Sequence, residues 1–187
     1  MIMFSEIKVA QMSAFILHLN GQKMSYLKLI KILYLAEREA VSRWGDSMSG
    51  DNFVSMPHGP VLSLTYNLIT GGSRMESDGW NKFISGCANY EVSSNLTNPD
   101  RDDWDELSDA ELAIIESIFN KFKHLTRWEL VDYTHDNCKE WIDPKGSSAP
   151  ISLEKIIYAT CDKSKTAALI SFSKSMNELS DARSIIQ

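Results

Sequence analysis

One segment constrains the fold of this chain more than any other, a long amphipathic helix predicted over residues 26–44. Its apolar residues recur at spacings of three and four, which places them on one face of a helix. Ser25 has the side chain of a helix N-cap, and Gly45 is a good terminator. We expect the apolar face to lie in the core. Its members are Tyr26, Leu29, Ile30, Leu33, Ala36, Ala40 and Trp44.

A second stripe of the same helix is basic, with Lys28, Lys31 and Arg38. A basic helix face can bind nucleic acid, but acidic residues lie among these side chains and the chain has a net charge of −6. We therefore expect the lysines to be solvated surface groups. We also expect no binding of nucleic acid by this chain alone.

The fold class predicted from the whole sequence is mainly α, a single compact helical domain with a small antiparallel β element. The 187 residues fit one domain, and we find no internal repeat. Capping boxes at Ser108 and Thr126, each with a glutamate three residues later, predict two helix starts. Further helices are predicted from residue 7 to Asn20-Gly21, from Leu153, and from Lys163.

The segment between the two helical halves predicts the β element. Phe53 to Met56 reads as a short strand, and Pro60 is expected to open a helix that ends at Gly71-Gly72. Residues 73–107 are the least regular part of the chain, with Trp80–Phe83 and Tyr90–Val92 as possible edge strands.

Composition and charge exclude several classes of protein. No stretch reaches the ~18–20 apolar residues of a membrane span, and no secretory signal is visible. Three widely spaced cysteines, Cys87, Cys138 and Cys161, suit a reducing cytoplasm better than a disulfide framework. The acidic net charge argues against an anionic membrane as partner. Residues 1–45 are nevertheless locally basic, with six Lys/Arg and three Asp/Glu, whereas residues 76–116 have two and eleven.

Catalysis and metal binding find little support. His135 and Cys138 have the spacing of one ligand pair, but a structural zinc site usually needs a second pair, so we expect no metal. An acid/base cluster could combine His58 or His135 with Asp132 or Asp136, yet such clusters are common on solvated surfaces. No nucleophile, phosphate or dinucleotide motif is present. We therefore expect neither an enzyme nor a cofactor.

Several motifs occur in an order that is specific as a set. The helix Lys28–Arg38 reads KLIKILYLAER, and it is followed by Trp44-Gly45 and then by His58-Gly59-Pro60-Val61. The second half adds Thr134-His135 with Trp141 six residues later. With these motifs the chain resembles the SocA-like antitoxins, also called the Panacea domain, over roughly residues 8–160. The domain would span residues 1–162, with 163–187 as a helical extension.

The resemblance implies a protein-binding function. Members of the family are antitoxins, usually encoded beside a toxin and often associated with phages or prophages, that neutralise the toxin by direct contact. Two alternatives are delivery of the toxin to a cellular protease and binding of a host factor. Six matching positions are expected to shape the scaffold: Lys28, Lys31, Tyr34, Gly59, Pro60 and Thr134. Five residues are candidates for contact with the partner: Phe53, His58, Trp104, His135 and Trp141. Among these, Trp104 is expected to be exposed in an acidic loop.

Overall fold

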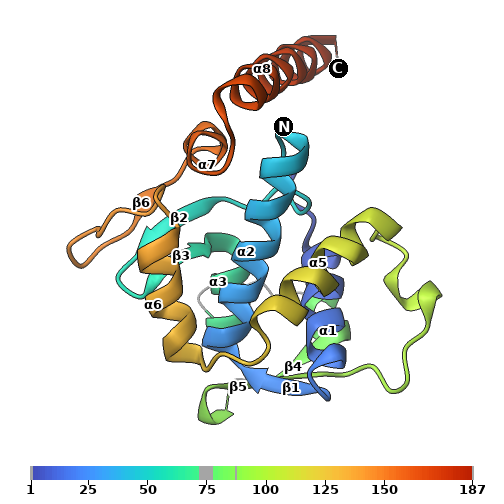
Figure 1. Ribbon diagram of the computed structural model, residues 1–187. Coiled ribbons are helices and arrows are strands. Elements are labelled where there is room, and N and C mark those ends of the chain that lie inside the picture. The colour runs from blue at the N-terminus through green and yellow to red at the C-terminus, as the bar shows by residue number, and fades with distance from the viewer. Residues whose placement is uncertain (1, 72–77, 87, 187) are drawn as a thin grey trace.

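The computed structural model describes residues 2–71, 78–86 and 88–186 and confirms a mainly α fold with antiparallel strands (Figure 1). The described residues form two small three-stranded sheets, with strand orders β1-β5-β4 and β3-β2-β6. The elements are α1 (Glu6–Leu19), β1 (Lys23–Ser25), α2 (Tyr26–Trp44), β2 (Phe53–Met56), β3 (Gly59–Leu62), α3 (Ser63–Thr70), α4 (Asp78–Phe83), β4 (Ile84–Ser85), η1 (Ala88–Tyr90), β5 (Glu91–Ser94), η2 (Arg101–Trp104), α5 (Asp109–Phe122), α6 (Arg127–Asn137), β6 (Ala149–Pro150), α7 (Leu153–Thr160) and α8 (Lys163–Ile186).

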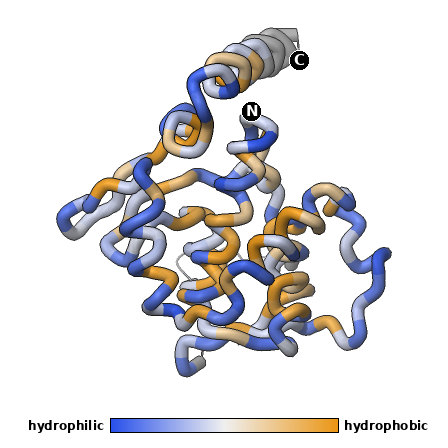
Figure 2. Tube along the Cα trace, viewed as in Figure 1, coloured by the Kyte–Doolittle hydropathy of each residue, from blue (hydrophilic) through white to orange (hydrophobic). Residues whose placement is uncertain are grey.

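Helix α2 is the central element, and it begins and ends where the sequence predicts. It contacts α1, α5, α6, α7 and β3, so that every residue from Leu29 to Glu37 is buried (Figure 1). Apolar segments gather where α1, α2 and α5 meet (Figure 2). Helices on several sides leave α2 no broad solvated face, and the prediction that Lys31 is solvated is therefore wrong. Trp44, expected in the core, is 37% exposed in the last turn.

The β2–β3 hairpin corrects the prediction of a helix opened by Pro60. Pro60 lies in β3 and pairs with Ser55 of β2, because β3 is an edge strand and the missing N–H of proline is tolerated there. The helix begins later, at Ser63. The buried carboxylate of Asp51 accepts hydrogen bonds from the amides of Leu64 and Thr65 at 2.9 and 2.8 Å, and thereby caps α3.

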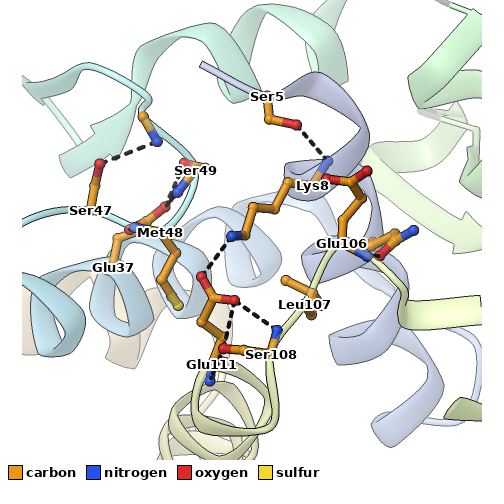
Figure 3. A network of polar contacts seen from close by, with 12 residues as sticks. Ser5, Lys8, Glu37, Ser47, Met48, Ser49, Glu106, Leu107, Ser108 and Glu111 are labelled. Atoms are coloured by element: carbon orange, nitrogen blue, oxygen red, sulfur yellow. Dashed lines mark hydrogen bonds and ion pairs between the residues drawn. The ribbon is translucent and has the colours of Figure 1, made fainter. Parts of the chain in front are cut away.

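Polar contacts fix the N-terminal helix and the loop after α2 (Figure 3). Both predicted capping boxes are present, and the Glu111 of the first also forms an ion pair with Lys8 of α1 at 2.7 Å. The buried Glu37 carboxylate accepts hydrogen bonds from the amides of Met48 and Ser49 at 2.6 and 2.8 Å. Burial raises the pKa of Glu37, and the hydrogen bonds from the Ser49 hydroxyl and from these two amides partly offset that rise.

The least regular segment is only partly as predicted. Residues 80–83 belong to helix α4 and form no strand. The expected strand near Val92 is β5, but it is not an edge strand, because it pairs with both β1 and β4. Cys87 lies outside the described residues. At the other end of the chain, α7 packs on α2 and α8 contacts α7 before it extends away from the other helices (Figure 1). Within the described residues, no helix is long and apolar enough to cross a membrane.

Candidate functional site

The motifs that carry the family resemblance meet at one place, where α2, the turn between β2 and β3, and α6 come together. The Lys31 ammonium, which is fully buried, donates a hydrogen bond to the carbonyl oxygen of Pro60 at 2.9 Å. Gly59 has a φ of +90°, and a Cβ there would lie 2.6 Å from Thr134 Oγ1 and 3.0 Å from Lys31 Nζ. Only glycine fits this position without a shift of its neighbours. We call Lys31, Gly59, Pro60 and Thr134 the motif junction.

Burial changes the chemistry of Lys31. Loss of hydration lowers the pKa of its ammonium from 10.5 to about 7. Near neutral pH the side chain is therefore close to half protonated. Burying a lysine ammonium costs free energy unless the charge is paired, hydrogen-bonded or lost by deprotonation.

A second set of polar side chains continues the same face of α2. Tyr34 donates to the Glu140 carboxylate at 2.8 Å, and Arg38 donates to its two oxygens at 2.6 and 3.1 Å. The Glu140 side chain is fully buried, so this paired contact ties α2 to the chain just after α6. Burial, followed by the charge of Glu140, raises the pKa of Tyr34.

The prediction from sequence missed Glu140, and it placed Lys31 and Arg38 on a basic stripe without Tyr34 and with its lysines solvated. Lys31, Tyr34 and Arg38 are three and four residues apart, which is the spacing of neighbours on a helix surface. That spacing was available as a signal for a shared polar face. Glu140 offers no such signal, because its position beside α2 depends on how α6 packs.

His135 and Trp141 support the hairpin from the side of α6. Their rings are stacked with centroids 4.1 Å apart, and Trp141 Nε1 donates to the carbonyl oxygen of Met56 at 3.0 Å. Both side chains are half-buried. His135 Nε2 is buried and has no hydrogen-bond partner among the described residues. Most of the surface of these two rings is therefore used inside the protein.

Of the five candidate contact residues, His58 is the one that is exposed. Its ring meets the ring of Trp128 edge to face at 5.6 Å, and the Arg127 guanidinium lies 5.6 Å from the centre of the same indole. Trp128 is 51% exposed. We call His58, Arg127 and Trp128 the Trp128 cluster. The cluster borders a cavity of about 420 Å³ between the start of α2, the β2–β3 turn and the start of α6, and we call this the α2 cavity.

Two other candidate contact residues are core residues. Trp104, expected to be exposed, is only 4% exposed because its ring packs edge to face on Phe15 at 5.3 Å. The acidic neighbours of Trp104 in sequence lie toward solvent, whereas its indole packs inward onto α1. Phe53 is also 4% exposed and packs against Tyr34 at 5.8 Å. Neither side chain is available for contact with a partner. Lys28 is half-buried, and its ammonium donates to the Lys123 carbonyl oxygen at 2.7 Å.

The groups of the suggested acid/base cluster are not gathered in one cavity. His58 lines the α2 cavity, whereas His135 stacks on Trp141, and Asp132 and Asp136 are exposed. Among the described residues, no three His, Cys, Asp or Glu side chains lie close enough to hold a metal ion.

The chain matches the model of the family described as antitoxin SocA-like, Panacea domain, over residues 29–142. The matched segment exceeds half of the chain and includes the whole motif junction, the Glu140 contacts and the Trp128 cluster. No curated protein and no solved structure matches the chain. Because the family match covers most of the folded core, the chain belongs to the SocA-like antitoxin family with a Panacea domain.

Proposed function

We propose that this protein is an antitoxin that binds a cognate toxin directly and thereby neutralises it. The observation that carries the proposal is the family match, since the family is named for antitoxins. The proposal includes three further points. The toxin is encoded by the adjacent gene, both proteins act in the cytoplasm, and inhibition needs neither a catalytic step nor a cofactor.

An exposed patch offers a surface for the toxin. Protein interfaces concentrate their binding energy in tryptophan, tyrosine and arginine. Trp128 and Tyr90 are 51% and 65% exposed and both line the α2 cavity, with Arg127 and His58 beside them. The buried motif junction lies directly behind this surface and holds the hairpin and α6 in fixed relation. A rigid support lowers the cost of ordering side chains on binding.

Co-expression with the product of the adjacent gene tests the proposal. We expect growth rescue and co-purification of a 1:1 complex. Rescue with no complex, abolished in a protease-deficient host, would instead favour delivery of the toxin to a protease. If the neighbouring product is harmless on its own, the dedicated antitoxin is refuted, and a phage or prophage protein that binds a host factor takes its place.

Two variants locate the surface in the same assay. We expect Trp128→Ala to lose rescue, because it removes the exposed indole at the centre of the Trp128 cluster. Tyr158→Ala is the matched control, since Tyr158 is an aromatic side chain of similar exposure, 68%, on α7. Equal rescue by both variants would remove the Trp128 cluster from the interface and leave the antitoxin function itself intact.

A further inference from the structure

The start of α2 lacks the side-chain cap that several other helices of this structure have. Ser25 occupies the N-cap position, but its side chain makes no capping hydrogen bond, and the first turn has no acidic residue. In contrast, Ser108, Thr126 and Ser152 each cap the helix that follows them. The amide groups at a helix N-terminus attract negative charge, so the start of α2, which has neither a side-chain cap nor an acidic residue in its own first turn, favours an anion near the α2 cavity.

A buried polar atom lies at the same place. Ser25 and Leu27 line the α2 cavity, and the buried Ser25 Oγ has no hydrogen-bond partner among the described residues. A buried hydroxyl without a partner costs free energy, which a ligand that accepts its hydrogen bond would recover. It concerns the same hydroxyl that leaves the start of α2 uncapped, so the two observations mark one polar position at the wall of the α2 cavity.

The charges around the cavity have one sign. Arg127 lines it with a permanent charge, the buried Lys31 ammonium also lines it but is only about half protonated near neutral pH, and no described lining residue carries a carboxylate. The nearby Glu129 carboxylate accepts a hydrogen bond from the Thr126 amide at 2.7 Å within the capping box of α6. The cavity therefore favours an anion, although the chain as a whole is acidic.

The remaining walls are aromatic and apolar. Tyr26, Tyr66, Tyr90 and Trp128 all line the cavity, and the rings of Tyr26 and Tyr90 lie 6.2 Å apart. A volume of about 420 Å³ lies in the range of ligand pockets. Such walls suit an apolar ring, which would be shielded from water on several sides. A ligand that fits both parts combines a ring with a negatively charged group.

We propose that the α2 cavity binds an acidic segment of the protein partner, in which a carboxylate lies next to an aromatic side chain. The carboxylate accepts hydrogen bonds from the first-turn amides of α2 and from Ser25 Oγ, with Arg127 at the rim. The aromatic ring lies against Trp128 and Tyr90. This inference rests on the proposed function for the nature of the partner, but its chemistry can be tested without the partner.

Two capped dipeptides provide the probes, Ac-Glu-Phe-NH2 and its neutral analogue Ac-Gln-Phe-NH2. Titration followed by ¹H–¹⁵N NMR is expected to shift the amides of Leu27 and Lys28 and the indole N–H of Trp128. The acidic probe should bind about ten-fold more tightly than the neutral one, because charged hydrogen bonds exceed neutral ones in strength. Equal binding of the two, shifts confined to other surfaces, or no shift at 20 mM of the probe (about the weakest affinity worth assigning) would overturn the proposal.

Site variants separate this cavity from other cationic surfaces. Arg127→Gln and Ser25→Ala should each weaken binding of the acidic probe by about five-fold or more. Arg43→Gln is the matched control, because Arg43 is an exposed arginine at the opposite end of α2. A loss of affinity in Arg43→Gln equal to that in Arg127→Gln would show general charge attraction and refute the cavity as the site.

Experiments with the partner show whether the cavity binds a segment of that protein or a small aromatic acid. In the co-expression assay, Arg127→Gln should reduce rescue, and excess acidic dipeptide should compete with the partner for the purified protein. Dipeptide binding without competition would assign the cavity to a small aromatic acid and overturn the peptide proposal. If wild-type protein fails to rescue while the dipeptides still discriminate, the antitoxin function fails and the ligand chemistry of the cavity stands.

Discussion

Replacement of Lys31 by methionine tests the consequence of burying an ammonium in this fold. Methionine has a similar length and no charge, so the variant keeps most of the packing and removes the titrating group. It also loses the hydrogen bond to the Pro60 carbonyl oxygen. That loss lowers the free energy of unfolding of the variant by the same amount at every pH. The pH dependence therefore isolates the charge.

The sign and size of the difference in unfolding free energy between wild type and Lys31→Met follow from two pKa values. The pKa of Lys31 is about 7 in the folded state and 10.5 in the unfolded chain. Between these values the unfolded chain binds a proton that the folded state gives up, so stability rises with pH. Each pH unit contributes up to about 1.4 kcal/mol, and between pH 7 and 9 the wild type should gain about 2 kcal/mol relative to Lys31→Met. Below pH 6 Lys31 is protonated in both the folded and the unfolded state. The curves of unfolding free energy against pH for wild type and Lys31→Met should therefore run parallel there.

Urea unfolding at half-unit steps from pH 5 to pH 9 measures this difference. Burial raises the pKa of Cys138 to about 12, so its stabilising effect is complete below pH 9 and is lost only above that value, where the unfolded thiol ionises. Lys23→Met is the control, because the Lys23 side chain is 67% exposed. Parallel curves for wild type and Lys31→Met across pH 7–9 would refute the buried, proton-releasing lysine.

Three further substitutions follow from the contacts, each measured by urea unfolding. Glu140→Ala should destabilise the protein by about 4 kcal/mol, because it leaves the half-buried Arg38 and the buried Tyr34 hydroxyl without their partner, whereas Glu39→Ala, at a half-exposed ion pair, should change stability by less than about 0.5 kcal/mol. Gly59→Ala should cost about 3 kcal/mol, and Gly21→Ala only about 1 kcal/mol, since both have positive φ but only Gly59 lacks space for a Cβ. Trp104→Ala should cost about 3–5 kcal/mol as a core truncation, and a loss below about 1 kcal/mol would contradict its burial.

Local patterns in the sequence predicted most helix boundaries correctly. The spacing of apolar residues and Gly45 set the length of α2, and the capping boxes at Ser108 and Thr126 both form. These signals act between residues a few positions apart, so they are present before the chain folds. Pro60 shows the limit of this reasoning, because a fixed φ suits both a first helical turn and an edge strand, and the choice depends on pairing with β2.

For the candidate site, too, some features could be predicted from the sequence and others depended on the tertiary structure. The sequence by itself determined the mainly α class and the ordered motifs, including His58-Gly59-Pro60-Val61. Only the tertiary structure decided that Lys31 is buried, that Trp104 faces inward, and that Ser25 and Trp128 line one cavity. The physical reason is that burial and the shift of a pKa depend on the elements that cover a side chain. Those elements lie up to about a hundred residues away in this chain, as in the contact of Arg38 with Glu140.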